Sequence, residues 1–165
     1  GKSTVSACLG KMLAMETIEM DSFIEEKEGM KISQIFETYG EEYFRNCESN
    51  TLIELRSKDH AVISCGGGVP LRANNVELMK KNGYIVWLTA EPDAVFDRVK
   101  NSTERPLLNG HMNVSYIADL MESRKQKYNA AADLVIDTTG KEIVEICEEL
   151  LQKLSAMQKN KKEEQ

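Results

Sequence analysis

The chain has 165 residues, of which 41% are apolar and 29% are charged, and its formal net charge is −6. A chain of this length and apolar share is expected to form one globular domain with a buried core, which excludes a largely disordered protein. The acidic balance argues against a nucleic-acid binder and a membrane-surface binder, because phosphate groups and anionic lipids attract basic surfaces.

The chain also lacks the sequence features of a membrane or secreted protein. No apolar run approaches the roughly 20 residues that span a bilayer, and no secretory signal opens the chain. Its four cysteines (Cys8, Cys47, Cys65 and Cys147) are far apart and form no C-x-x-C pair. This pattern predicts a cytoplasmic protein with reduced thiols and no structural zinc site.

Helical and strand-like patterns alternate along the chain. Apolar residues at helical spacing predict helices at 3–13, 21–28, 33–38, 41–58, 74–81, 91–100, 114–132 and 141–157. Ser33 is the expected N-cap of the helix over 33–38. Short β-like runs predict strands at 16–20, 61–65, 84–89 and 134–137. The stretch 101–113 is polar and irregular, with Pro106 and Gly110.

Strands that alternate with longer helices favour crossover connections and a parallel sheet. We therefore predict an α/β fold of three layers, in which helices flank both faces of the sheet. Residues 1–158 are expected to form a single domain, and the charge run 159–165 a solvated tail.

The first four residues, Gly1-Lys2-Ser3-Thr4, match the end of the phosphate-binding pattern G-x-x-x-x-G-K-[ST]. The N–H groups at a helix N-terminus face a bound phosphate, and the helix dipole favours its negative charge. Lys2 would then reach the β- and γ-phosphates of a nucleotide, and the Ser3 hydroxyl would bind Mg²⁺. The alternative is an ordinary helix start with an exposed lysine.

A phosphate loop of this kind normally follows a buried strand. No such strand stands before Gly1 in the sequence. We therefore expect the first strand of the sheet to be absent from this sequence, with about ten residues preceding Gly1 in the intact protein. Its absence would leave an unpaired strand edge and an apolar groove in the sheet.

Two carboxylates follow the first β-like stretch. Residues two apart on an extended chain face the same side, so Glu19 and Asp21 are expected to project together. One would lie near a metal ion and the other near a substrate hydroxyl. The alternative is surface charge at a helix N-terminus, with Asp21 as a cap.

Three consecutive glycines, Gly66, Gly67 and Gly68, follow the buried run 61–65. Glycines at the carboxyl end of a strand allow a ligand to contact the backbone, and this end of a parallel sheet is where ligands bind. A flexible turn is the alternative.

Three arginines are candidates for anion binding. Arg45 and Arg124 lie within predicted helices, where a guanidinium would suit a small-molecule carboxylate. Arg105 lies in the irregular stretch, as expected of a loop that covers a transferring phosphoryl group. The alternative interpretation for each of them is a solvated surface arginine.

Taken in order, these motifs resemble those of shikimate kinase, a small P-loop kinase with the nucleoside-monophosphate-kinase fold. The resemblance covers about residues 1–154. It is carried by GKST (1–4), EMDSFIE (19–25), I-x-x-I-F-x-x-x-G-E-x-x-F-R-x-x-E (32–48), SCGGG (64–68), RPLL (105–108), R-x-x-x-Y (124–128) and VIDT (135–138). The ordered set is specific, although each motif alone is weak.

The resemblance implies transfer of the ATP γ-phosphate to the 3-hydroxyl of shikimate, in the pathway to aromatic amino acids. It implies that Gly1, Lys2, Ser3 and Thr4 bind the nucleotide, with Arg105 on its phosphates and Arg98 assisting. Asp21 would bind the acceptor hydroxyl and act as the base.

The acceptor site implied by the resemblance lies in helices within about 21–58, under a lid at about 101–118. Arg45 and Arg124 would hold the shikimate carboxylate, and the glycines 66–68 would contact the substrate through Gly67. Phe36 and Phe44 would wall the pocket. Mg²⁺ would be bound near Ser3 and Glu19, and the enzyme is expected to act as a monomer on ATP and shikimate.

The chain departs from the family pattern at Glu19, where the family usually has an aspartate. Two other functions remain open at this stage. One is a different small-metabolite P-loop kinase, acting on gluconate or a nucleotide, which needs no pair of carboxylate-binding arginines. The other is a nucleotide-binding fragment without catalytic activity.

Overall fold

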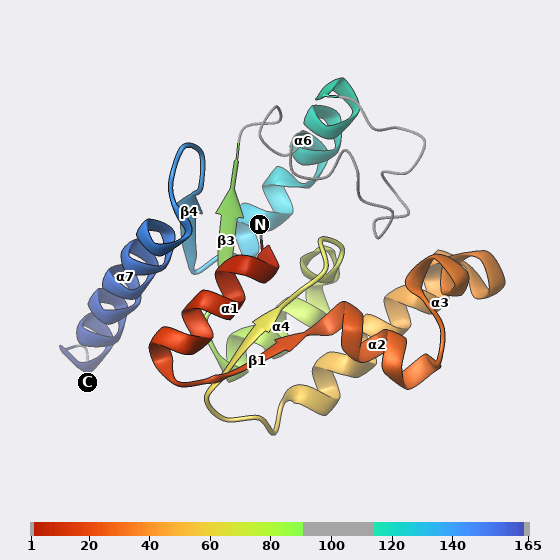
Figure 1. Cartoon of the computed structure of the whole chain (residues 1–165), viewed down its shortest axis with the longest axis horizontal. Coiled ribbons are helices and arrows are strands. Elements are labelled where there is room, and N and C mark those ends of the chain that lie inside the picture. The colour runs from red at the N-terminus through yellow and green to blue at the C-terminus, as the bar shows by residue number, and fades with distance from the viewer. Residues whose placement is uncertain (1, 91–113, 164–165) are drawn as a thin grey trace.

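The computed structural model describes residues 2–90 and 114–163 (Figure 1). Its helices are α1 (Lys2–Leu13), α2 (Met20–Glu28), α3 (Ile32–Leu55), α4 (Ala73–Asn82), α6 (Val114–Ala131) and α7 (Ile143–Glu163), with a short 3-10 helix, η1 (Val69–Leu71). Its strands are β1 (Glu16–Glu19), β2 (Ala61–Ser64), β3 (Val86–Thr89) and β4 (Leu134–Asp137). In these residues, no helix is both long and apolar enough to cross a membrane.

The four strands form two parallel pairs. In the first pair β1 lies beside β2, with Glu16 opposite Ala61 and Glu19 opposite Ser64. In the second pair β3 lies beside β4, with Val86 opposite Leu134. In the described part of the chain, β2 and β3 are not hydrogen-bonded to each other. The prediction of parallel strands is confirmed, and the ladder is interrupted between the two pairs.

Helix α1 packs on both strand pairs and joins them into one core. Its buried residues Val5 and Leu9 belong to a cluster with Ile136 of β4 and with Ile146 and Leu150 of α7. Partly buried side chains from β2 and β3 pack against the same cluster: Val62, Val86 and Leu88. Figure 1 shows α1 beside the strands, with α7 next to β4.

A second cluster covers the opposite face of the first strand pair. Met20, Leu52 and Leu55 are buried there with Val69, and Ile18 and Ile63 of the strands pack against them. Val62 and Ile63 therefore contribute to different clusters, as expected for neighbouring residues of a strand whose side chains alternate between faces. With helices on both faces, the predicted three-layer arrangement is confirmed around β1 and β2.

Helix α3 is two helical segments joined at Gly40. This residue has φ 87° and ψ 174°, a conformation that glycine adopts far more easily than other residues. The two helices predicted at 33–38 and 41–58 are thus the two segments of α3, which are separated by the break at Gly40 and end at Leu55. Ser33 is not the N-cap, because the helix begins at Ile32 after Lys31, whose N–H donates to Gln34 Oε1 at 3.0 Å.

The predicted end of the last helix was wrong. Helix α7 continues to Glu163 instead of stopping near Met157, so most of the charge run predicted as a tail is helical. Lysine and glutamate have high helix propensity, and nothing in their sequence breaks the helix. The helix expected at 91–100 and the irregular stretch 101–113 lie outside the described residues, as do Gly1, Arg98 and Arg105. Residues 114–118 of the expected lid belong to α6.

Candidate active site

The three glycines after β2 form the centre of the site, because each of them lies against a different polar side chain. A Cβ atom on Gly66 would lie 2.8 Å from Glu48 Oε2 and 3.4 Å from Asp21 Oδ1. On Gly67 it would lie 2.7 Å from Arg124 Nη1, and on Gly68 it would overlap the Arg45 guanidinium. The absence of side chains at 66–68 is what lets polar groups from α2, α3 and α6 converge on one turn.

Arg45 is held by two carboxylates of its own helix. Its Nη1 donates to Glu48 Oε1 at 2.8 Å, and its Nη2 lies 3.3 Å from Glu41 Oε1. The guanidinium carbon is also 5.4 Å from the centre of the Phe44 ring. Burial alone would lower the pKa of Arg45, but Glu48 and Glu41 raise it above its ordinary value, so the cation is secure.

Glu48 is a buried carboxylate, with only 1% of its surface exposed. Burial raises its pKa above the ordinary range, although the hydrogen bond from Arg45 opposes this shift. An uncompensated buried charge would be costly, and Arg45 supplies the compensation. The pair therefore fixes the direction of the Arg45 guanidinium toward the turn at Gly68.

Arg124 approaches the same turn from α6. Its Nη1 donates to the hydroxyl of Tyr128 at 3.4 Å, and that hydroxyl donates to the carbonyl oxygen of Gly67 at 2.5 Å. Arg45 and Arg124 are 79 positions apart in the sequence, yet both lie against consecutive glycines. The structure thus brings together the two arginines that the sequence assigned to one carboxylate.

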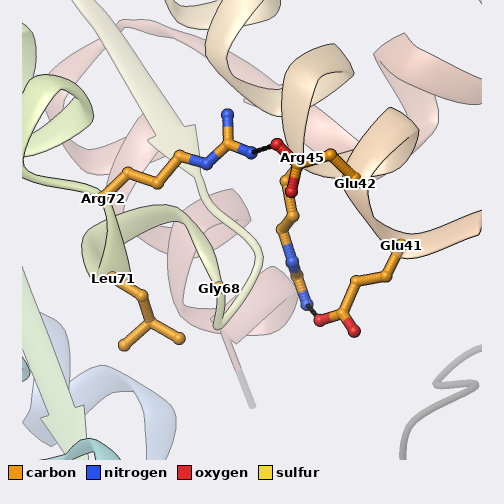
Figure 2. A pocket seen from close by; sticks show the side chains of 6 residues that line it. All are labelled: Glu41, Glu42, Arg45, Gly68, Leu71 and Arg72. Carbon is orange, nitrogen blue, oxygen red and sulfur yellow. Dashed lines mark hydrogen bonds and ion pairs between the residues drawn. The ribbon is translucent and has the colours of Figure 1, made fainter.

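A pocket of about 430 Å³ opens beside Arg45. It is lined by Glu41, Glu42, Arg45, Gly68, Leu71 and Arg72. Figure 2 shows that Arg45 and Arg72 reach this pocket from different elements, and that each is joined to a glutamate of α3. Arg72 Nη2 lies 3.0 Å from Glu42 Oε1, and its Nη1 donates to Asn46 Oδ1 at 3.0 Å. Four of the six lining residues are therefore charged, and both arginines among them are paired with glutamates.

The two carboxylates after β1 lie near this turn, but not in the way predicted. Glu19 is the last residue of β1, and Asp21 already belongs to the first turn of α2. The two are therefore not alternate residues of an extended chain. They nevertheless share a neighbour: burial raises the pKa of the Cys65 thiol to about 12, with Lys2 opposing the shift and Glu48, Asp21 and Glu19 adding to it. Lys2, Asp21 and Glu19 thus face the same end of β2.

The surroundings of Ser64 fit a magnesium site. Its hydroxyl is buried without a hydrogen-bond partner, the only such side-chain atom found in the described residues. Glu19 is its neighbour across the β1–β2 ladder. No cluster of three histidine, cysteine or acidic residues occurs in that part of the chain. One carboxylate with hydroxyls suits Mg²⁺, which takes few protein ligands and keeps water and substrate phosphates around it.

Comparison of this chain with known proteins shows which family it belongs to. The family model described as shikimate kinase matches residues 1–155. The chain belongs to the shikimate kinase family. It is 43% identical to the shikimate kinase of Sulfurihydrogenibium sp. (strain YO3AOP1) over 154 residues, which cover 93% of this chain and 91% of that protein. It is 40% identical to the shikimate kinase of Persephonella marina over 92% of this chain and 90% of the relative.

Solved shikimate kinase structures share the fold. The enzyme from Acinetobacter baumannii in complex with shikimate superposes with a TM-score of 0.90 at 32% identity, over 94% of this chain and 87% of that one. The enzyme from Aquifex aeolicus superposes with a TM-score of 0.80 at 35% identity, over 94% of this chain and 90% of that one. These matches agree with the P-loop kinase fold predicted from the sequence.

The remaining predicted residues of this shikimate kinase site lie at the start of α1 and within α3. Ser3 and Thr4 are exposed in the first turn of α1, and Lys2 is half-buried there. Phe36 and Phe44 pack on each other with ring centres 4.9 Å apart. Phe44 is buried in a cluster with Ile24, Ile32 and Ile35. Phe44 supports Arg45, and a direct contact of either ring with substrate stays a prediction.

Three residues that contact or adjoin the site were not assigned a role from the sequence: Glu48, Ser64 and Tyr128. The signals for two of them were present in the shikimate kinase motifs. Glu48 is three residues after Arg45, and Tyr128 is four residues after Arg124, which places each pair on one helix face. Ser64 is part of the SCGGG motif (64–68), but the burial of its hydroxyl could not be predicted, because it depends on the packing around β2.

Proposed function

We propose that this chain catalyses the transfer of the γ-phosphate of ATP to the 3-hydroxyl of shikimate, giving shikimate 3-phosphate and ADP. The observation that carries the proposal is the convergence of Arg45 and Arg124 on the Gly67–Gly68 turn. Membership of the shikimate kinase family and the fold shared with a shikimate complex support it.

The acceptor is held by its carboxylate. Guanidinium groups bind carboxylates through paired, charge-assisted hydrogen bonds, and two of them fix both the position and the orientation of the ring. Arg45 is anchored by Glu48, so it retains a defined direction when substrate enters. The glycines carry no side chains of their own, so a substrate held by the two arginines can approach the backbone of the turn closely.

Asp21 is the group that receives the acceptor hydroxyl. Its Oδ1 would lie 3.4 Å from a Cβ on Gly66, so the carboxylate stands at the edge of the turn that holds the ring. In phosphoryl transfer the main requirement is an in-line arrangement of the attacking and leaving oxygens. Asp21 therefore orients the hydroxyl toward the γ-phosphate and accepts its proton as the new P–O bond forms.

The nucleotide is bound at the N-terminus of α1. The N–H groups at the N-terminus of this helix and the ammonium of Lys2 favour the phosphates of ATP. Ser3, Glu19 and Ser64 are the residues that would hold Mg²⁺, directly or through water, and a bound ion would supply positive charge against the phosphates of ATP. Arg105 is proposed to cover the transferring group, with Arg98 assisting.

Gluconate and nucleoside monophosphates are the alternative acceptors left open by the sequence. Neither needs two arginines on one glycine turn, and the family model favours shikimate. The decisive experiment is a coupled assay of ADP release with ATP and Mg²⁺, in which shikimate, gluconate and nucleoside monophosphates are compared. Turnover with shikimate alone is expected. Equal turnover with gluconate, or ATP binding without turnover of any acceptor, would overturn the proposal.

A further inference from the structure

Tyr128 is a member of the site whose side chain touches both Arg124 and the glycine turn. It lies one helical turn after Arg124 on α6, and its hydroxyl is within hydrogen-bond distance of Arg124 Nη1 (3.4 Å) and Gly67 O (2.5 Å). Its ring and that of Trp87 of β3 form a T-shaped pair, with centres 5.5 Å apart and planes at 77°. The tyrosine therefore links α6, β3 and the turn after β2.

The direction of the two hydrogen bonds is fixed by chemistry. A backbone carbonyl oxygen can only accept, so the Tyr128 hydroxyl donates its single proton to Gly67 O. The hydroxyl oxygen then presents its lone pairs to Arg124, whose guanidinium can only donate. The phenol is thus an orienting group that connects the guanidinium to the backbone of the turn.

The two substrate arginines are oriented by different means. Arg45 is ion-paired to Glu41 and Glu48. Among the residues that the structure describes, Arg124 makes no ion pair, and its hydrogen bond is to a neutral phenol. A neutral partner fixes the direction of a guanidinium without neutralising its charge. Within the described residues, the charge of Arg124 is therefore not matched by a carboxylate, and it can pair with the carboxylate of an incoming substrate.

We propose that Tyr128 is a positioning residue for substrate binding, which holds Arg124 and the Gly67 carbonyl in the geometry that receives the shikimate carboxylate. This inference rests on the proposed role of Arg124 in carboxylate binding. Tyr128 itself takes no part in phosphoryl transfer, so its hydroxyl is expected to govern the affinity for shikimate and leave the ATP site unchanged.

The test is Tyr128→Phe, which removes the hydroxyl and keeps the ring contact with Trp87. The KM for shikimate is expected to rise about tenfold, the usual effect of losing a hydrogen bond that orients a charged group, while kcat and the KM for ATP stay within about twofold. Trp87 is the single tryptophan of the chain, so its fluorescence reports the dissociation constant of shikimate without ATP and should show the same change.

Tyr43→Phe is the matched control. It removes a tyrosine hydroxyl that donates to Glu28 Oε2 at 2.8 Å, away from the glycine turn, and should leave the KM for shikimate unchanged. Methyl shikimate, which lacks the carboxylate charge, provides a second control, because Tyr128→Phe should scarcely affect its KM. An equal loss with the ester would indicate a general structural effect and would overturn the inference.

Arg124→Lys separates this inference from the proposed function. If Arg124 binds the carboxylate, the lysine variant has a raised KM for shikimate, and adding Tyr128→Phe to it produces little further change. A raised KM in Arg124→Lys with a normal KM in Tyr128→Phe refutes the positioning role alone. A normal KM in Arg124→Lys refutes the role proposed for Arg124 and with it the inference, while turnover of shikimate would still stand.

Discussion

Gly67→Ala tests how closely the glycine turn and Arg124 fit together. The new Cβ would lie 2.7 Å from Arg124 Nη1 and 3.0 Å from the Tyr128 hydroxyl oxygen. For ordinary contacts of 3.4 Å, Nη1 must withdraw by about 0.7 Å and the hydroxyl by about 0.4 Å. The Arg124–Tyr128 hydrogen bond is already 3.4 Å long, so this displacement removes it and turns the guanidinium away from the substrate.

The expected effect of Gly67→Ala falls on binding more than on stability. Gly67 has no positive φ, so alanine introduces no backbone strain, and the displaced atoms are the ends of side chains. Replacing glycine also reduces the entropy of the unfolded chain, which offsets part of the loss. We expect the free energy of unfolding to change by less than about 1 kcal/mol. Loss of one oriented, charge-assisted contact of about 1.5 kcal/mol raises the KM for shikimate roughly tenfold.

The assay for Gly67→Ala measures the KM for shikimate and for ATP together with thermal unfolding. Gly83→Ala is the matched control, because a Cβ there meets nothing within 4 Å and its φ of 174° is extended backbone. This control is expected to keep the parent kinetics. If Gly67→Ala folds normally and binds shikimate as tightly as the parent, the close approach of Arg124 to the turn has no part in substrate binding.

Three further substitutions test the groups around the turn. Asp21→Asn should lower kcat by about a hundredfold or more with an unchanged melting temperature, and parent-like turnover would exclude Asp21 as the base. Glu48→Gln removes a carboxyl whose pKa is raised by burial. A raised folded-state pKa adds stability at low pH that is lost as the pH rises above about 4.3, so the advantage of the parent protein over this variant in urea unfolding should shrink with rising pH. An advantage that grows with pH would contradict this. Ser64→Ala removes a buried hydroxyl without a partner, so the metal-free protein should keep its melting temperature while half-maximal activity needs more Mg²⁺. A large fall in melting temperature would show instead that the hydroxyl is structurally bonded.

The order and type of the elements could be predicted from the sequence. Period-3.6 and β-like patterns depend on residues close together in the chain, and α1, α4, α6, β2 and β4 lie within two residues of their predicted ranges. The break in α3 was also foreseeable, because Gly40 separates two helical patterns. The end of α7 was not, because charged residues of high helix propensity are equally common in helices and in solvated tails.

Site membership was predicted, but site geometry was not. Motifs alone brought Arg45, Arg124, Asp21 and the glycines together as one group. The sequence placed Glu19 and Asp21 on one extended strand, whereas helix α2 begins between them at Met20, whose side chain is buried against Leu52 and Leu55.

The sequence by itself determined the alternating α/β order, and it predicted which residues bind phosphate and carboxylate groups. What only the tertiary structure decided is which partner each of these residues meets. The bond from Tyr128 to Gly67 spans 61 positions, and the contact of Arg124 with the same glycine spans 57. Such pairings depend on how α3 and α6 pack around the end of β2. Local sequence patterns do not determine the distances between elements that are remote in the chain.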